Sequence, residues 1–266
     1  MAAGKGLRIG VIGGAGWLGG AIAAATLDAG IIEPQNLSLS YRNKRLNRFP
    51  DAFWTSDNQA LADRSDVIVL SVRPADWSGL KVNAEDKLVV SVMAGIRVDA
   101  ICGHHQTRRV VRSLPNAAAE VRKSYTPWTA TADVDEKDRA IVRAIFDACG
   151  VQDEVASEAE IDYFTGLSGS GPAFPALLAE AMMTDAIAYG LDRRVAQRAV
   201  NTLIVGAGRL LEQREDCPTD TVQTFLDYRG TTAAALEEMV AAGFNTAVAR
   251  GLTAAFRKSI RMGGAS

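Results

Sequence analysis

The chain has 266 residues, of which 48% are hydrophobic and 23% are charged, and its formal net charge at pH 7 is −2. This length and composition predict a soluble globular protein with one large α/β unit or two modest domains. The near-neutral charge argues against a nucleic-acid partner, because a nucleic-acid-binding protein normally shows a basic excess.

The amino-terminal region predicts no targeting segment. A strand pattern begins within about seven residues of Met1, which leaves no room for the charged region, apolar region and cleavage site of a signal peptide. No apolar run approaches the roughly 20 residues that a membrane-spanning helix needs. We therefore expect a cytoplasmic protein with no membrane partner.

The cysteines and histidines give no metal-binding pattern. Cys102, Cys149 and Cys217 are far apart and form no CxxC pair, so the sequence predicts buried free thiols. The only two histidines, His104 and His105, are adjacent and lie near no cysteine pair or HExxH pattern. We expect a solvated helix end or turn at this histidine pair, and no bound metal.

In chain order, the first predicted unit is a strand, a tight turn and a helix. Apolar residues 7–12 predict the strand, and a helical pattern over 21–29 ends at Gly30. Between them, Gly14, Gly16 and Gly19 follow the GxGxxG spacing, and Gly13 is an extra glycine in front of it. Such glycines form the turn, admit a pyrophosphate at the helix start and let the helix pack on the strand. The motif predicts nucleotide binding, with a structural glycine turn as the alternative.

The second predicted strand, residues 37–40, bears on cofactor choice. It lies about 20 residues after the last motif glycine, where an NAD enzyme carries an acidic residue for the ribose 2′-hydroxyl. This chain instead has Arg42, Lys44 and Arg45 and no carboxylate at the strand end. These cations suit a 2′-phosphate and favour NADP over NAD, with a solvated basic turn as the alternative.

The next strands complete a parallel sheet. Continuous apolar runs at 66–72, 87–92 and 109–112 are typical of strands buried on both faces, and each ends in a short loop. Since ligands bind beyond the carboxyl ends of parallel strands, these loops should line the cofactor. A weaker strand over 123–132, a helix over 135–148 and a short strand near Val151 complete a Rossmann-type doubly wound sheet.

Beyond Ser157 the β-branched runs end and helical periodicity takes over. It predicts helices over residues 161–166, 172–189, 192–213, 219–226 and 231–261, the last broken near Gly243. We therefore divide the chain into a dinucleotide-binding domain, 1–157, and an all-helical domain, 158–266, without a flexible linker. About 105 residues of Ala- and Leu-rich helix have little core of their own, so we expect mutual burial in a homodimer.

The composition of the helical half limits the chemistry. From Gly150 to Arg257 there is no lysine and no histidine. Carbonyl reduction usually needs a Lys, His or Tyr as proton donor, so this absence counts against a ketone substrate and favours an activated electrophile such as an iminium. Thr231 and Thr232 follow Gly230 between two predicted helices. One threonine is the expected N-cap, and free N–H groups there either bind a carboxylate or are simply capped.

Taken together, these segments resemble the pyrroline-5-carboxylate reductase family, from Ile9 to about Arg261. LSGSGPAF, residues 167–174, is similar to the SGSGPAY signature of the family. SVRP is similar to the VKP of the family, and VRSLPN is similar to its VRxMPN. The segment MAGI also occurs in the family. Near the carboxyl end, RGTTAAALEEMVAAGF resembles GGTTxxGLxxLExxGF.

This resemblance implies the reduction of 1-pyrroline-5-carboxylate to L-proline, in proline biosynthesis, by hydride transfer from NADPH (or NADH) to the C=N carbon. Thr232 would be catalytic, with its hydroxyl close to the imine nitrogen, while N–H groups of the same loop hold the carboxylate. The substrate-binding residues would be Glu158, Ser170, Gly230, Thr231 and Thr232. The cofactor-binding residues would be Gly13, Gly14, Ala15, Gly16, Trp17, Leu18, Ser40, Arg42, Asn58, Ser71, Val72, Arg73, Pro74, Met93, Ala94, Gly95 and Asn116. The resemblance also implies a homodimer interlocked through the helical domain, often assembled further.

One segment departs from the family pattern. Where the family has SPGGTT, residues 227–232 read Asp-Tyr-Arg-Gly-Thr-Thr. A glycine that needs a positive φ cannot become arginine without strain, so either the loop has a new shape or the substrate differs. Arg229 could bind a carboxylate with Asp227 as its partner, or both could be surface residues. The rival hypotheses are a paralogue acting on a related imine or carbonyl compound and a non-catalytic NADP-binding regulator.

Overall fold

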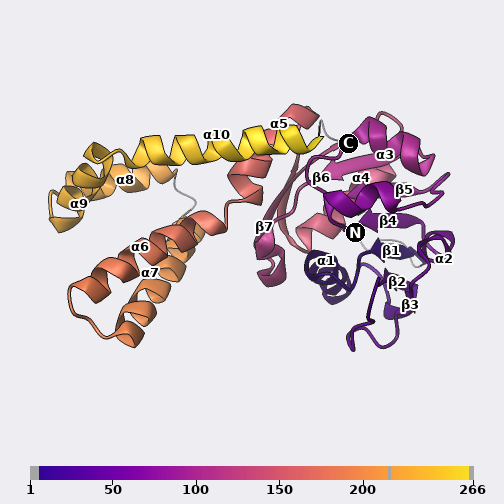
Figure 1. Ribbon diagram of the computed structural model, residues 1–266, viewed down its shortest axis with the longest axis horizontal. Coiled ribbons are helices and arrows are strands. Elements are labelled where there is room, and N and C mark those ends of the chain that lie inside the picture. The colour runs from indigo at the N-terminus through magenta and orange to yellow at the C-terminus, as the bar shows by residue number, and fades with distance from the viewer. Residues whose placement is uncertain (1–5, 215–216, 264–266) are drawn as a thin grey trace. The chain divides into compact units, whose positions relative to one another are not determined.

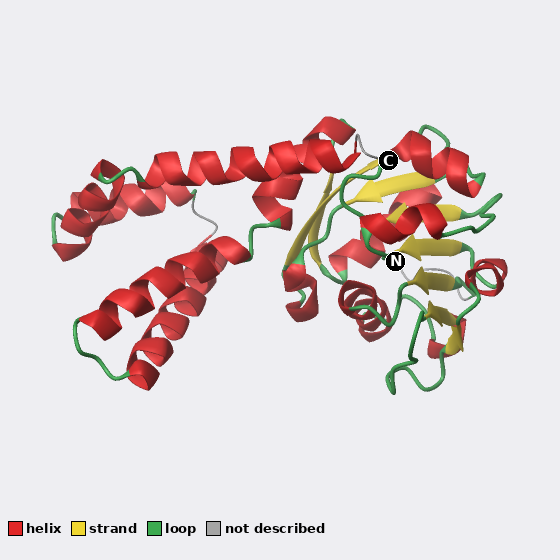
Figure 2. Ribbon diagram, viewed as in Figure 1, coloured by secondary structure: helices red, strands yellow, loops and turns green. Residues whose placement is uncertain are grey.

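The computed structural model describes residues 6–214 and 217–263. The chain divides into two compact units (Figure 1). The first comprises Met1–Ser170 and Ala254–Ser266, and the second comprises Gly171–Thr253. The sheet lies in the first unit, and the regular structure described in the second unit is helical (Figure 2).

The first unit is built on an eight-stranded sheet with the order β3-β2-β1-β4-β5-β6-β7-β8. Its strands are β1 (Ile9–Ile12), β2 (Leu37–Ser40), β3 (Phe53–Thr55), β4 (Val67–Leu70), β5 (Leu88–Ser91), β6 (Val110–Ser113), β7 (Ser124–Ala130) and β8 (Gly150–Glu154). Neighbouring strands are parallel except β6 and β7. The predicted Rossmann-type sheet is confirmed.

The antiparallel β6–β7 pair has a simple cause. A parallel connection needs a crossover of a dozen or more residues. Between Ser113 and Ser124 the chain has room only for the one-turn helix η3 (Ala117–Val121), so it returns in the opposite direction.

Helices cover both faces of this sheet. They are α1 (Trp17–Asp28), η1 (Pro34–Asn36), α2 (Asn58–Asp63), η2 (Pro74–Gly79), α3 (Val98–His105), α4 (Glu136–Asp147), α5 (Glu158–Phe164) and the π-helix η4 (Thr165–Gly169). The short helices η1, η2, η3 and η4 were not predicted, and among the strands and α-helices β3, α2 and α3 were not predicted either. They have three, six and eight residues, too few for a clear periodic pattern.

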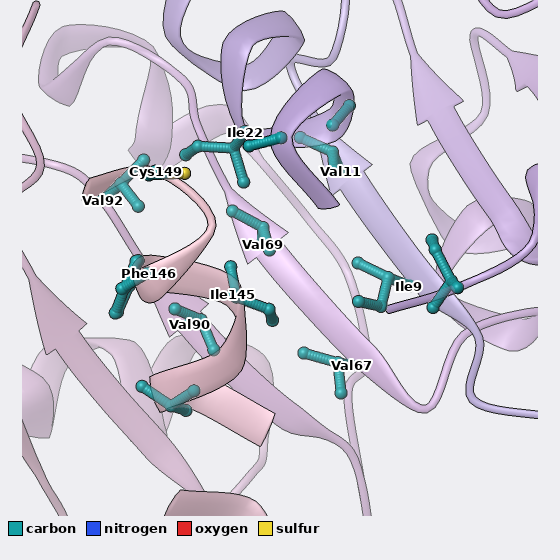
Figure 3. Packing of buried hydrophobic residues seen from close by; sticks show 14 of the residues in the cluster. Ile9, Val11, Ile22, Val67, Val69, Val90, Val92, Ile145, Phe146 and Cys149 are labelled. Atoms are coloured by element: carbon teal, nitrogen blue, oxygen red, sulfur yellow. The ribbon is translucent and has the colours of Figure 1, made fainter. Parts of the chain in front are cut away.

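Each face of the sheet has its own hydrophobic core. Successive residues of a strand point to opposite faces, so β4 contributes Val67 and Val69 to one core and Ile68 and Leu70 to the other. The first core also holds Ile22 of α1 and Ile145 and Phe146 of α4 (Figure 3). The second holds Leu61 of α2, Trp77 of η2 and Ile101 of α3. This double burial explains why the central strands read as continuous apolar runs.

The second unit contains α6 (Ala173–Ala188), α7 (Arg193–Arg214), α8 (Pro218–Asp227), α9 (Thr231–Ala241) and the start of α10 (Phe244–Gly263), which enters the first unit at Ala254. The predicted break at Gly243 separates α9 from α10. Asp192 caps α7 by accepting hydrogen bonds from the N–H groups of Arg194 and Val195, at 3.0 and 3.2 Å. Few apolar side chains are buried here: Ala196, Val200 and Ala233.

The histidine pair lies at a helix end, as predicted, but the prediction that it is solvated was wrong, because His104 is half-buried and His105 is buried. His105 lies at the end of α3 with only 1% of its surface exposed, its ring 5.9 Å from that of Trp77 and its Nδ1 3.0 Å from the carbonyl oxygen of Val82. The last turn of α3 packs against the second core, which buries it. Among residues 6–214 and 217–263, no group of three or more His, Cys, Asp or Glu side chains is placed to hold a metal ion.

The prediction of buried thiols is correct only for Cys149. This side chain lies in the first core, where burial raises its pKa to about 11. Cys102 is half-buried and Cys217 is exposed, because α8 begins in the unit with little core. None of the helices in the described parts of the chain is long and apolar enough to span a membrane.

Candidate cofactor and substrate site

Three glycines shape the turn between β1 and α1. At Gly13, φ is +84°, and an added Cβ would lie 2.3 Å from the carbonyl oxygen of Ser71. Gly16 is the N-cap of α1, and its N–H donates to the carbonyl of Gly13 at 2.8 Å. At Gly19 a Cβ would approach the same carbonyl to 2.6 Å. Gly13, placed outside the GxGxxG spacing in the sequence, is therefore the glycine of the turn.

The start of α1 presents free backbone donors. Its N-cap makes no side-chain hydrogen bond, so the first-turn N–H groups and the helix dipole can receive an anion such as a pyrophosphate. Ser40 supports the turn, because its Oγ accepts a hydrogen bond from the Gly13 N–H at 3.1 Å. Trp17 is 55% exposed and its Nε1 donates to Glu120 at 2.8 Å, while Leu18 is half-buried.

The basic segment after β2 is partly neutralised. Arg42 forms an ion pair with Asp76 at 3.2 Å, and the Nε of Arg73 donates to the same carboxylate at 2.8 Å. The Arg73 guanidinium, and after it Arg42, holds the pKa of the Asp76 carboxyl below its usual range. The guanidinium of Arg45 lies over the ring of Trp54, 5.8 Å from its centroid. Cations therefore gather at the carboxyl end of β2, with Asp76 as a competing anion.

The sheet brings most of the predicted cofactor residues to one edge. β2, β1, β4 and β5 are adjacent and parallel, so the segments that follow them meet at the carboxyl edge. These segments hold Gly13–Leu18, Ser40, Arg42, Ser71–Pro74 and Met93–Gly95. Asn58 is half-buried at the first position of α2, where Asp57 is the N-cap.

Asn116 has a role in the fold that the sequence did not indicate. Its side-chain Oδ1 accepts from the N–H of Ala118 at 2.9 Å, and its Nδ2 donates to the carbonyl oxygen of Ser168 at 3.0 Å. The amide thus ties η3 to the π-helix. Its contact with the cofactor stays a prediction.

Glu158 lies in a cluster of four charged side chains. Its Oε1 accepts from Arg112 Nη1 at 2.9 Å and from the N–H of Val98 at 3.0 Å, and its Oε2 lies 3.2 Å from Arg97 Nη2. Arg112 is 1% exposed and also donates to Asp162 at 2.5 Å, while its Nε has no partner. Sequence reasoning missed Arg97, Arg112 and Asp162, because this cluster joins residues some 50 positions apart.

The segment Thr165–Ser170 packs against the loop that follows β6. Its π-helix was not predicted, and such turns often mark functional sites. A Cβ on Gly169 would lie 2.9 Å from a methyl carbon of Leu114, which explains the small residue here. Ser170 is half-buried, and its hydroxyl donates to the carbonyl of Thr165 at 3.1 Å.

The loop before α9 belongs to the second unit. Gly230 is the N-cap of α9 and makes no side-chain cap, so the prediction of a threonine N-cap was wrong. Thr231 and Thr232 are instead the first two helical residues, and both are exposed. Their first-turn N–H groups have no side-chain acceptor at the N-cap.

One of the residues that depart from the family pattern, Arg229, has a backbone conformation typical of glycine. Arg229 has φ +51°, in the left-handed region, and its N–H closes α8 by donating to Leu226 at 3.0 Å. Asp227 accepts from Gln223 at 2.8 Å, and Tyr228 is 88% exposed. Strain is therefore retained at Arg229, as expected for a non-glycine residue there.

Comparison with known proteins gives matches along nearly the whole chain. Residues 158–262 match the family model for pyrroline-5-carboxylate reductase dimerisation, and residues 8–95 match that for NADP oxidoreductase coenzyme F420-dependent. The chain is 30% identical to pyrroline-5-carboxylate reductase from Synechocystis sp., covering 97% of this chain and 98% of the relative. It is 30% identical to the Thermus thermophilus enzyme of the same name, covering 94% and 97%.

Solved structures of the same name share the fold. The Coxiella burnetii pyrroline-5-carboxylate reductase has a TM-score of 0.87 at 26% identity, covering 96% of this chain and 98% of that one. The Plasmodium falciparum pyrroline carboxylate reductase, solved with NADP bound, has a TM-score of 0.85 at 25% identity, covering 97% and 99%.

Proposed function

Because this chain belongs to the pyrroline-5-carboxylate reductase family, we propose that it reduces 1-pyrroline-5-carboxylate to L-proline with NADPH. The observation that carries the proposal is the likeness to reductases of that name over almost the full length, 97% of the chain in the Synechocystis sp. case. The glycine turn and the cations after β2 support the cofactor half of the reaction independently.

The residues at the carboxyl edge of the sheet suit NADPH. A Cβ at Gly13 would meet the carbonyl oxygen of Ser71, and one at Gly19 would meet that of Gly13, so these glycines allow the close packing of strand, turn and helix that dinucleotide-binding folds need. We place the 2′-phosphate near Arg42, with Ser40, Asn58 and the loops after β4 and β5 as further contacts; NADH is the alternative cofactor. Bound NADPH would supply the hydride, and the side chains of this chain orient the two reactants.

For the substrate we keep the assignment implied by the family. The Thr232 hydroxyl lies near the imine nitrogen, the N–H groups of Gly230–Thr232 hold the carboxylate, and Glu158 and Ser170 complete the site. Catalysis then rests on orientation and hydrogen bonding. The absence of lysine and histidine between Gly150 and Arg257 is compatible with this, because the imine nitrogen needs no dedicated side-chain acid.

We also propose a division of labour along the chain. Residues 1–157 bind the dinucleotide, and residues 158–266 complete the substrate site and form a homodimer, with a higher oligomer as a further stage. The match of residues 158–262 to a dimerisation family and the exposed apolar side chains of the second unit support this. A place in proline biosynthesis follows from the proposed reaction, and we also propose a cytoplasmic location.

A substrate panel tests the proposal. Purified protein is mixed with NADPH and pyrroline-5-carboxylate, a related cyclic imine or a ketone, and NADPH absorbance is followed. We expect the fastest oxidation with pyrroline-5-carboxylate. Faster oxidation with another imine would favour the rival hypothesis of a paralogue that acts on a related compound. That hypothesis is based on the departure of residues 227–229 from the family pattern. Cofactor binding by calorimetry without turnover of any compound would favour the non-catalytic regulator.

A further inference from the structure

Arg112 is a buried cation between two carboxylates of α5. Its side chain is 1% exposed, and its guanidinium donates from Nη1 to Glu158 at 2.9 Å and from Nη2 to Asp162 at 2.5 Å. Glu158 and Asp162 are four residues apart on a helix, so they lie on one face of α5. Among the residues that the structure describes, the Nε of Arg112 has no hydrogen-bond partner.

Stability alone does not explain this burial. A buried ion pair gains little over apolar residues of the same size, because both charges lose their hydration. A buried donor without a partner adds a further cost, and the Nε of Arg112 is such a donor. The reason for the cluster is therefore to be found in the segments that it holds in place.

Glu158 connects Arg112 to the start of α3. Its Oε1 also accepts a hydrogen bond from the N–H of Val98, the first residue of α3, at 3.0 Å. The N-cap of α3, Arg97, makes no side-chain hydrogen bond to the helix, so a carboxylate 60 positions away satisfies one of its first-turn donors. Because α3 begins shortly after the predicted cofactor loop 93–95, Glu158 also fixes the end of that loop.

The residues just after β6 contact the segment that follows α5. Asn116 donates through its side-chain amide to the carbonyl oxygen of Ser168, at 3.0 Å. Leu114 lies so close to Gly169 that an added Cβ there would be 2.9 Å from a methyl carbon of Leu114. Ser170, the proposed substrate contact, follows directly. The chain from β6 thus holds both α5 and η4 at the carboxyl edge of the sheet.

We propose that Arg112 is a positioning residue for the reaction. By holding Glu158, it fixes the spacing between the cofactor loop 93–95 and the segment that ends at Ser170, and this spacing sets how the imine meets the cofactor. Arg112 acts through Glu158 and not by contact with a reactant, because only 1% of its side chain is exposed. The inference rests on the proposed function and adds to it a residue that orients the site.

A purely stabilising role for Arg112 makes a different prediction. In that case its loss lowers the free energy of unfolding, while the molecules that remain folded react normally. A positioning role instead predicts slower hydride transfer in protein that is folded and binds NADPH. Single-turnover mixing of the enzyme–NADPH complex, in excess, with the imine separates the two roles, because its first-order rate constant does not depend on the folded fraction.

The experiment compares three variants with the wild type on 1-pyrroline-5-carboxylate. Arg112→Lys keeps the charge and removes the planar fork that bonds two carboxylates at once. Asp162→Asn keeps the shape of the side chain, removes the charge of one partner and leaves Glu158 unchanged. Arg109→Lys is the matched control, because Arg109 also pairs with a buried carboxylate, that of Asp138, but just before the amino end of β6.

For Arg112→Lys we expect the single-turnover rate constant to fall about tenfold to hundredfold. Calorimetry should give an NADPH Kd within about threefold of the wild-type value, because the glycine turn and the cations after β2 are unchanged. Asp162→Asn should show the same pattern to a smaller extent. Arg109→Lys should unfold at a lower urea concentration and keep the wild-type rate constant.

A wild-type rate constant in Arg112→Lys, or an equal loss in Arg109→Lys, would overturn the inference. If Arg112→Lys does not fold, a slower single turnover in Asp162→Asn supports the inference and a wild-type rate constant overturns it. Failure of both variants to fold would also overturn it, by assigning the cluster to stability alone. A wild type that does not turn over 1-pyrroline-5-carboxylate would instead overturn the proposed function, and the role of Arg112 with it.

Discussion

Arg229 illustrates how a single residue can carry strain in the loop that departs from the family pattern. At φ +51° it occupies a region in which a non-glycine side chain costs roughly 1–2 kcal/mol. The sequence predicted either a new loop shape or a different substrate, and at Arg229 the structure shows a positive φ with an arginine in place of glycine. The sequence thus identified this loop as unusual, but it did not predict the backbone conformation of Arg229.

We predict that Arg229→Gly stabilises the protein by about 1 kcal/mol, because relief of the left-handed strain exceeds the entropy lost to glycine in the unfolded chain. Urea denaturation midpoints at fixed protein concentration measure the change. The neighbouring variant Tyr228→Gly is the control. Tyr228 has φ −68°, so glycine there should be destabilising. Equal effects of the two variants would show that Arg229 is not strained.

The buried histidine gives a pH-dependence prediction. Burial in the second core lowers the pKa of His105 below its ordinary value near 6.5, with the neighbouring His104 as a smaller cause. The unfolded chain then takes up a proton near pH 6.5 while the folded protein does not. The contribution to stability is therefore fully present above that pH and is lost as the pH falls through it toward the lower folded value.

We therefore expect the free energy of unfolding to fall between pH 7 and pH 5 more steeply in the wild type than in His105→Gln. Urea titrations at several pH values measure both slopes. Indistinguishable slopes would contradict the proposed cause, because other acidic and basic groups are the same in the two proteins.

The placement of residues was predictable where the signal is local and not where it is spatial. The glycine turn between β1 and α1 follows from spacing along the chain, and the basic segment at Arg42 from charge at a strand end. The partners of Glu158 do not, because Arg112 meets it only when β6 and α5 pack together. The burial of His105 likewise depends on which turn of α3 faces the core.

At the scale of elements, the sequence was most informative where glycine, proline and capping residues mark the ends. Predicted helices over 172–189, 192–213 and 219–226 differ from α6, α7 and α8 by one residue at each end. The short elements β3, α2 and α3 and the π-helix lacked such a signal. The direction of β7 was not predicted; it follows from the short connection between β6 and β7, which is too short for a parallel crossover.

The packing of α1 on the glycine turn gives an element-scale prediction. In Gly19→Ala the new Cβ would lie 2.6 Å from the Gly13 carbonyl, so α1 must shift, at a cost of about 1–3 kcal/mol. If that strain falls on the turn that binds the pyrophosphate, NADPH binding weakens about tenfold or more. Calorimetric titration with NADPH measures it.

Gly103→Ala provides the matched control. Gly103 lies within α3, and an added Cβ there meets nothing within 4 Å. We expect unchanged NADPH affinity and a gain in stability of up to about 1 kcal/mol, because alanine favours the helix. Equal NADPH affinity in both alanine variants would exclude the proposed packing role of Gly19.

At the scale of the whole molecule, the second unit has few buried apolar side chains, which supports the proposed homodimer. Many of its large apolar side chains are exposed, including Leu177, Leu203, Val205 and Val240. Helical composition predicted this feature, and the dimerisation family match agrees with it. The number of subunits was not readable from the sequence.

We predict that Leu177→Asp weakens self-association, because a carboxylate would have to be buried in the interface. Sedimentation velocity should show lighter species at concentrations where the wild type is a dimer or larger. Val121→Asp is the control, since Val121 has a similar exposure, 67% against 66%, but lies in the first unit. Dissociation of both variants or of neither would contradict an interface through the helical domain.

The central claim is that this chain transfers a hydride from NADPH to the C=N carbon of 1-pyrroline-5-carboxylate. Its most direct test uses NADPH carrying deuterium at the transferred position and analyses the product by mass spectrometry and NMR. The claim predicts L-proline with one deuterium on the ring carbon that belonged to the C=N bond. Unlabelled proline, label at another carbon, or NADPH oxidation without proline would contradict it.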